Sequence, residues 1–178
     1  HHVFRLPSST TGRRPRGEDK EVGQIPEVCL VAVGMRVVLT RNQGLPSFMG
    51  LNNGAMGTVV GPLYAPGAQA TDLPIAIVVD WPQYSGPAWD PQHPTWVPIP
   101  LNTSHDQESG ATRTGFPLKP GYATVIHKSQ GMSIGDGKLV ERLRLVLGDG
   151  IDMEKTFLGL LYVACSRVER DSYWVLCS

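Results

Sequence analysis

The chain has 178 residues, of which 41% are hydrophobic, and its 16 basic and 16 acidic side chains give a formal charge of zero. This length suffices for one ordinary domain or two small ones with a buried core. A zero net charge excludes a global basic field that attracts nucleic acid, so any such binding must come from local clusters.

No apolar stretch is long enough to span a bilayer, and no basic-then-apolar leader begins the chain, so we expect no membrane partner. Cys29, Cys165 and Cys177 are odd in number and form no CxxC pair, which favours a reducing compartment. We therefore expect an intracellular protein that is nuclear, mitochondrial or cytosolic. The start at His1-His2, without methionine, fits an internal fragment or the remnant of a tag.

Residues 1–25 are polar and partly basic, with Arg13, Arg14 and Arg16 around a proline. This composition predicts a linker or disordered segment. An arm that binds nucleic acid is the alternative, and the acidic residues that follow favour the solvated linker.

Residues 26–112 contain short β-rich runs separated by Gly, Pro and Asn, at 30–40, 55–60, 75–81 and 95–99. Strands at this spacing predict a small barrel of the SH3-like kind. Asn52-Asn53-Gly54 predicts a tight turn with positive φ, and Gly57 and Gly61 allow bulges or a corner. Residues 61–74 and 82–94 are predicted to be long loops.

The aromatic residues of this β-rich region have two interpretations. Trp81 ends an apolar run and is expected in the core, whereas Trp89 and Tyr84 either stack on bases or pack within their loop. His93 and His105 show no metal-ligand spacing, so we predict no metal site.

After Arg113 the pattern alternates between strand and helix, with strands at 116–118, 139–147 and 172–177 and helices at 122–130 and 153–168. Such alternation predicts parallel βαβ units. The apolar residues of the second helix recur at the spacing of one buried face and leave Arg167 near its C-terminal end. A surface salt bridge is the plainest role for this arginine.

Residues 126–131 gather hydrogen-bond donors before a glycine. His127, Lys128, Ser129 and Gln130 can hold several phosphate oxygens, and Gly131 lets a backbone approach closely. A solvated loop is the alternative, and these residues alone do not decide between the two.

Residues 29–61, 113–134 and 160–168 resemble, in this order, the C-terminal part of PIF-type, RecD-like superfamily 1 DNA helicases. The resemblance depends most on His127-Lys128-Ser129-Gln130-Gly131 together with the run from Tyr162 to Arg167. It implies an α/β fold in which a partial RecA-like domain, the second motor domain, carries an inserted small SH3-like β-barrel. Residues 26–112 would then be the insertion with its flanking strands, and 113–178 the C-terminal part of the RecA-like domain.

The resemblance also implies roles for individual residues. Arg167 would be catalytic, as the arginine that reaches the γ-phosphate of ATP on a partner RecA-like domain, where such a residue contributes about 10³ to 10⁵ in rate. Gln130 and Gly131 would join it in ATP binding. His127, Lys128 and Ser129 would hold the phosphates of single-stranded DNA, with Thr124 as a further contact because Val125 stands where relatives often have Ser or Thr. Cys165 stands where leucine is common, and a small packed hydrophobe is its expected role.

The sequence contains no GxxxxGK[ST] loop and no acidic pair after an apolar strand, so it lacks the groups that hold the β-phosphate and Mg²⁺. We expect no ATP hydrolysis by this chain alone. ATP and Mg²⁺ would be bound mainly by an N-terminal RecA-like helicase domain, in a longer protein of DNA repair, recombination or telomere maintenance. The alternative is a non-catalytic module from a truncated helicase, which binds single strands or a protein.

Overall fold

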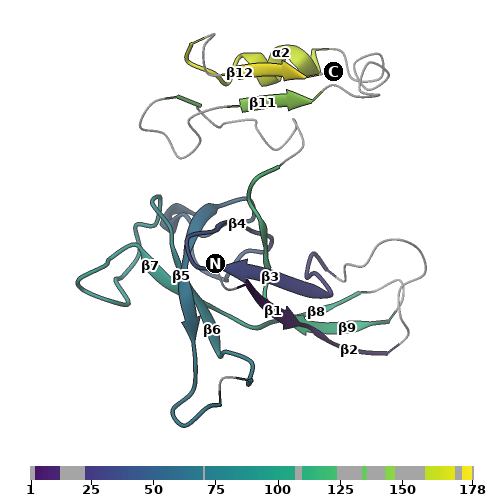
Figure 1. Cartoon of the computed structure of the whole chain (residues 1–178), viewed down its shortest axis with the longest axis vertical. Helices are drawn as coiled ribbons and strands as arrows, with labels where there is room; N and C mark the ends of the chain where they lie inside the picture. The colour runs from purple at the N-terminus through teal and green to yellow at the C-terminus, as the bar shows by residue number, and fades with distance from the viewer. Residues whose placement is uncertain are drawn as a thin grey trace. The chain divides into compact units, whose positions relative to one another are not determined.

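A computed structural model of the chain describes residues 3–12, 23–69, 71–106, 110–123, 134–135, 143–146, 159–170 and 174–177. The chain divides into two compact units, residues 1–122 and 123–178 (Figure 1). The first unit is built from strands, and the second contains both strand and helix.

The first unit contains ten strands and one short 3₁₀ helix among its described residues. They are β1 (Val3–Pro7), β2 (Ser9–Thr11), β3 (Val28–Ala32), β4 (Arg36–Leu39), η1 (Ser47–Met49), β5 (Met56–Leu63), β6 (Ala76–Asp80), β7 (Trp96–Pro100), β8 (Asn102–His105), β9 (Thr112–Gly115) and β10 (Leu118–Pro120). Five of them form an antiparallel sheet in the order β10-β4-β5-β6-β7. A pair, β1-β3, and a three-stranded sheet, β2-β9-β8, complete the unit.

The four β-rich runs predicted between residues 30 and 99 are all strands, with one correction. The run 30–40 is not one strand, because Gly34 adopts a φ of 80° and the chain turns there between β3 and β4. Gly54 has the positive φ expected of the turn at Asn52-Asn53-Gly54. The pairing of β5 with β6 shifts register between Val59 and Gly61, so the predicted bulge is also confirmed.

The prediction of a linker over residues 1–25 is wrong for residues 3–12. β1 pairs antiparallel with β3, from Val3 opposite Ala32 to Pro7 opposite Val28, and β2 pairs with β9. Leu6 is buried and Phe4 packs against the core, so one face of β1 is apolar. The alternation of buried and exposed residues extends over one short strand only. The polar residues that follow dominate the composition of residues 1–25, and for this reason the strand was not predicted.

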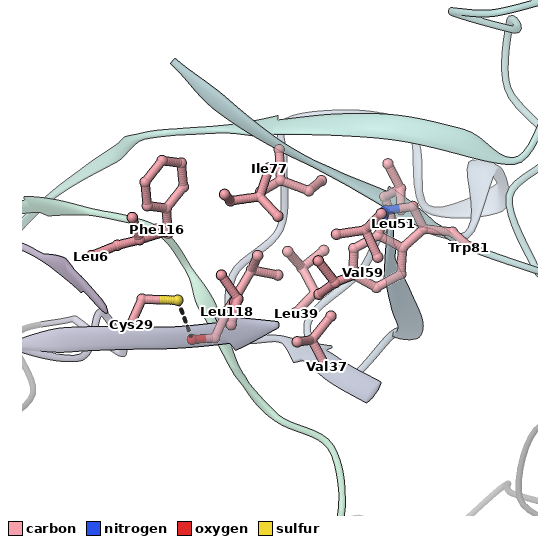
Figure 2. Close-up of a cluster of buried hydrophobic side chains, with 13 residues drawn as sticks. Leu6, Cys29, Val37, Leu39, Leu51, Val59, Ile77, Trp81, Phe116 and Leu118 are labelled. Carbon is pink, nitrogen blue, oxygen red and sulfur yellow. Dashed lines mark hydrogen bonds between the residues drawn. The ribbon is translucent and has the colours of Figure 1, made fainter. Parts of the chain in front are cut away.

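The core of the first unit lies among strands of both the five-stranded sheet and the β1-β3 pair (Figure 2). Its members are buried hydrophobic side chains: Leu6, Cys29, Val31, Val37, Leu39, Leu51, Val59, Ile77, Val79, Trp81, Ile99, Phe116 and Leu118. Burying a side chain of this size stabilises the fold by about 1.5–3 kcal/mol, which makes this cluster the main source of stability in the unit. Trp81 is 1% exposed, as its place after an apolar run predicted.

Arg113 joins three segments of the first unit. Its side chain is 4% exposed, its Nε donates to Thr10 Oγ1 at 2.9 Å, and its Nη1 donates to the carbonyl oxygen of Ile25 at 3.2 Å. A buried guanidinium requires such acceptors, because an uncompensated buried charge is costly. Residues 113–122 therefore lie in the first compact unit, whereas the sequence analysis assigned them to the second domain.

The second unit contains a parallel strand pair with a helix between its strands in sequence. β11 (Leu143–Val146) pairs in parallel with β12 (Trp174–Cys177), and α2 (Leu160–Cys165) lies between them along the chain. Parallel strands need such a crossover connection, so the predicted βαβ pattern is confirmed here. Residues 124–130 of the other predicted helix, and residues 153–158 of this one, lie outside the described residues.

None of the helices in the described ranges is long and apolar enough to cross a membrane.

Candidate functional site

Arg167 lies two residues after the end of α2, next to the C-cap residue Ser166, and backbone hydrogen bonds fix its position. Its N–H donates to the carbonyl oxygen of Ala164 at 3.2 Å, and its own carbonyl oxygen accepts from the N–H of Ile134 at 2.8 Å. The N–H of Glu169 then donates to the carbonyl oxygen of Ile134 at 3.0 Å, which completes a parallel bridge between Ile134 and Val168. The arginine is thus attached both to its helix and to a segment more than thirty residues earlier in the chain.

Two buried apolar residues anchor this arrangement. Ile134 and Ala164 are each 2% exposed, so the backbone on both sides of Arg167 is attached to packed side chains. Gly135 lies against Glu169, since a Cβ there would meet Glu169 Oε2 at 2.5 Å. Close packing of this kind limits how far the backbone of Arg167 can move.

The guanidinium of Arg167 is held by its neighbour. Its Nε and Nη2 donate to Ser166 Oγ at 3.2 and 2.9 Å, and Ser166 Oγ donates to the carbonyl oxygen of Val163 at 3.0 Å. Within the ranges that the structure describes, no carboxylate forms an ion pair with Arg167. The half-buried guanidinium therefore keeps N–H donors for an acceptor supplied from outside.

The other predicted site residues, which are Thr124, His127, Lys128, Ser129, Gln130 and Gly131, lie outside the described residues. Of the predicted site, the structure therefore places Arg167 alone, and the roles of the six others stay predictions.

Ser166 has a structural role that the sequence analysis missed. The available signal was a short hydroxyl residue directly before the single arginine of an apolar helical run, where a serine can bond back to the helix carbonyls.

The aromatic residues of the first unit have mixed environments. Tyr84 packs against the core and its hydroxyl donates to the carbonyl oxygen of Pro87 at 2.9 Å, which favours loop packing for this residue. Trp89 is 52% exposed, so its side chain is accessible from solvent. Trp96 stacks on the ring of His93, with centroids 3.7 Å apart.

The two histidines of this region have protein partners. His93 Nδ1 lies 2.8 Å from Asp90 Oδ2, and this hydrogen bond, with a second from the backbone N–H of Gln92, lowers the pKa of Asp90. His105 Nδ1 lies 2.8 Å from Thr112 Oγ1. No group of three or more His, Cys, Asp or Glu side chains that could hold a metal ion occurs among the described residues.

Comparison with solved structures identifies the class of fold as that of a helicase. One match is a Pif1 structure that concerns DNA unwinding at forked double-stranded DNA by two coordinating Pif1 helicases, with a TM-score of 0.65 and 21% identity. Another is the crystal structure of Pif1 helicase from Candida albicans, with a TM-score of 0.60 and 21% identity. Each match covers 99% of this chain, which has the fold of part of a Pif1-like helicase, and the resemblance in its sequence is confirmed at the level of fold.

The chain spans 33% and 39% of the lengths of these two structures. No protein-family model matches the sequence, and no curated protein does.

Proposed function

We propose that the chain is the C-terminal portion of an ATP-dependent DNA helicase. In this proposal it grips single-stranded DNA and supplies Arg167 to ATP bound on a first RecA-like domain elsewhere in the protein. The observation that carries the proposal is the state of Arg167, whose backbone is fixed on both sides and whose guanidinium is held by Ser166 without a carboxylate partner among the described residues.

A planar, permanently charged guanidinium fits the requirement of phosphoryl transfer. It stabilises the charge on the transferring oxygens, and its value depends on being positioned before the reaction. Ser166 supplies that positioning without neutralising the charge, because its hydroxyl is neutral. Gln130 and Gly131 would border the same nucleotide, and ATP would bring Mg²⁺ held mainly by the first domain.

The strand would be held by phosphate contacts from Thr124, His127, Lys128 and Ser129. Such contacts give affinity without reading sequence, and their strength falls as the salt concentration rises. Closure of two RecA-like domains around ATP and their reopening after hydrolysis would move the strand.

The fold assignment belongs to the same proposal. Residues 26–112 contain an SH3-like insertion, and residues 123–178, the second compact unit, belong to the C-terminal part of the second RecA-like domain. The antiparallel order β4-β5-β6-β7 and the parallel β11-β12 pair support the two assignments. We further propose a nuclear, mitochondrial or cytosolic location, with duties in DNA repair, recombination or telomere maintenance.

The test is the substitution Arg167→Ala in a full-length protein that carries a GxxxxGK[ST] loop. We expect ATP hydrolysis to fall by about 10³-fold or more, because the charge on the transferring phosphoryl group loses its partner. Binding of single-stranded DNA, followed by fluorescence anisotropy, should change little.

Arg170→Ala is the matched control, since Arg170 is an exposed arginine three residues further along the chain. It should leave hydrolysis within about twofold of the unchanged protein. Near-normal hydrolysis by the Arg167→Ala protein would contradict the catalytic role.

A second candidate is a non-catalytic module that binds single strands or a protein, and the lack of a GxxxxGK[ST] loop in the sequence favours it. It predicts salt-dependent strand binding by this chain alone, weakened by Lys128→Ala and unaffected by ATP. Undetectable binding of a labelled oligonucleotide at low salt would remove this candidate.

A further inference from the structure

A polar pocket of about 270 Å³ lies in the first unit, among loops that the proposed catalytic chemistry does not use. It is lined by Gln24, Arg41, Asn42 and Asn53, none of which carries a negative charge. Its volume is several times the ~30 Å³ share of one water molecule, so a phosphate group fits within it.

The internal hydrogen bonds of the pocket use up acceptors and leave donors. Asn42 Oδ1 accepts from the backbone N–H of Asn53 at 2.7 Å, and Gln24 Oε1 accepts from Asn53 Nδ2 at 3.0 Å. The orientation of Asn42 is fixed, because a backbone N–H can only donate. The side-chain NH₂ of Asn42 must therefore be a donor that remains for a ligand.

Arg41 adds a charged donor to the same pocket. Its Nη1 donates to the carbonyl oxygen of Thr103 at 3.3 Å, which holds the half-buried guanidinium in place. In the described part of the chain, Nε and Nη2 of Arg41, Nε2 of Gln24 and Nδ2 of Asn42 all have no acceptor. The lining residues carry three side-chain oxygens, and among the described residues Asn53 Oδ1 is the only one of these that accepts no hydrogen bond.

The backbone around the pocket is held in an unusual conformation. Gln24 has a φ of 66°, the one positive value at a non-glycine residue in the described ranges. Such a residue costs about 1–3 kcal/mol and persists only where its surroundings hold it, most often at functional sites. Gly23 leaves no room for a side chain, since a Cβ there would lie 1.7 Å from Ser104 Oγ.

We propose that this pocket binds a backbone phosphate of a single-stranded nucleic acid, with Arg41 as the charged donor and the side-chain amides of Asn42 and Gln24 as neutral donors. A cluster rich in donors and poor in acceptors selects a ligand rich in acceptors, and a cation among the donors selects an anion. That the phosphate belongs to a nucleic-acid strand rests on the proposed function. That the pocket favours an anion follows from its donors alone.

The test is fluorescence anisotropy of labelled oligo-dT with the full 178-residue chain, over ~50 to 200 mM salt. Asn42→Asp keeps the oxygen that accepts from Asn53 and replaces the NH₂ donor by negative charge, so the loop should keep its conformation. We expect roughly tenfold weaker binding. Arg41→Gln should also weaken binding, and should reduce the slope of log K against log salt by ~0.7, the value for one phosphate contact on a single strand.

Two matched controls separate the pocket from the general effect of charge. Gln83→Glu makes the same amide-to-carboxylate change on an exposed loop, and Arg5→Gln removes an exposed arginine from β1. Both should leave the affinity within about twofold. Unfolding in urea checks that every variant is folded.

The outcomes separate this inference from the proposed function. Weaker binding by the Asn42 and Arg41 variants, with no effect of Lys128→Ala, supports the pocket and contradicts the proposed strand contact. The reverse pattern overturns the pocket alone, and a wild-type chain that does not bind overturns both. Binding of an abasic oligonucleotide should still be weakened by Arg41→Gln. If Arg41→Gln no longer weakens binding of the abasic strand, the pocket contacts bases and not the phosphate.

Discussion

Cys29 shows at the scale of a single residue how burial sets chemistry. Its side chain lies in the core, and Sγ donates to the carbonyl oxygen of Leu118 at 3.5 Å (Figure 2). Burial raises the pKa of the Cys29 thiol to about 12, because the thiolate would lose its hydration. The thiol therefore stays protonated at neutral pH and behaves as a small packed hydrophobe.

We predict that this thiol makes stability depend on alkaline pH. Between about pH 9, where the unfolded thiol ionises, and about pH 12, where the folded one does, the unfolded state has lost a proton that the folded state keeps. The free energy of unfolding should then fall as the pH rises, by up to ~1.4 kcal/mol per pH unit. Urea unfolding of the wild-type chain and of Cys29→Ala at several pH values measures this contribution.

The Cys29→Ala chain is the reference for the wild-type chain in that experiment, because all other groups that ionise at alkaline pH are present in both proteins. We expect a shallower loss of stability above about pH 9 in the variant. Equal pH dependence of the two chains would show that Cys29 ionises in the folded state.

At the scale of elements, strand β5 carries two glycines with different surroundings. A Cβ on Gly57 would lie 2.6 Å from the carbonyl oxygen of Asp80 and 2.6 Å from Val79 Cγ1, whereas a Cβ on Gly61 would meet nothing within 4 Å. Gly57 thus allows β5 and β6 to approach closely, while Gly61 lies at the bulge.

We predict that Gly57→Ala destabilises the first unit by about 1–3 kcal/mol, because neither backbone nor packed core can move aside without strain. Gly61→Ala is the matched control on the same strand and should change stability by less than about 0.5 kcal/mol. Chemical denaturation of both variants gives the comparison. Equal effects of the two substitutions would contradict the close approach at Gly57.

Elements could be predicted from the sequence wherever an apolar run was bounded by turn residues. The turn at Asn52-Asn53-Gly54 and the strands of the β-rich region are of this kind, because their signals are local. β1 and β2 were missed, since the pairing of Ser9 with Thr114 depends on residues more than a hundred positions away. The buried environment of Arg113 was hidden for the same reason.

The candidate site shows the same division between local and distant information. Arg167 could be singled out because one arginine ends an apolar helical run, and the family resemblance supplied its role. Its attachment to Ile134 could not be predicted, because backbone pairing across more than thirty residues leaves no mark on composition. The pocket at Arg41 escaped notice for a related reason, since it unites loops around residues 24, 42 and 53.

At the scale of the whole molecule, the largest buried hydrophobic cluster among the described residues lies within residues 1–122. We predict that a chain ending at Tyr122 folds by itself, because it keeps this core and the three sheets of the first unit. Its urea unfolding should be cooperative, with a midpoint close to that of the corresponding transition in the full chain.

A broad, non-cooperative unfolding transition for this fragment would contradict that expectation. The variant Trp81→Ala is a useful comparison, because it removes the largest core side chain and should cost about 3–5 kcal/mol. Loss of cooperativity in this variant alone would show that the fragment depends on its own core.

The pairing of β2 with β9 has a consequence for the length of the chain between these two strands. Ser9 lies opposite Thr114 and Thr11 opposite Thr112 in antiparallel register, so the chain passes the same place twice in opposite directions. Residues 12–111 therefore connect two strands that lie side by side, so this segment starts and ends at neighbouring positions. Because this pairing fixes the spacing of β2 and β9 whatever the length of chain between them, loops within residues 12–111 can grow or shrink in evolution without separating the two strands.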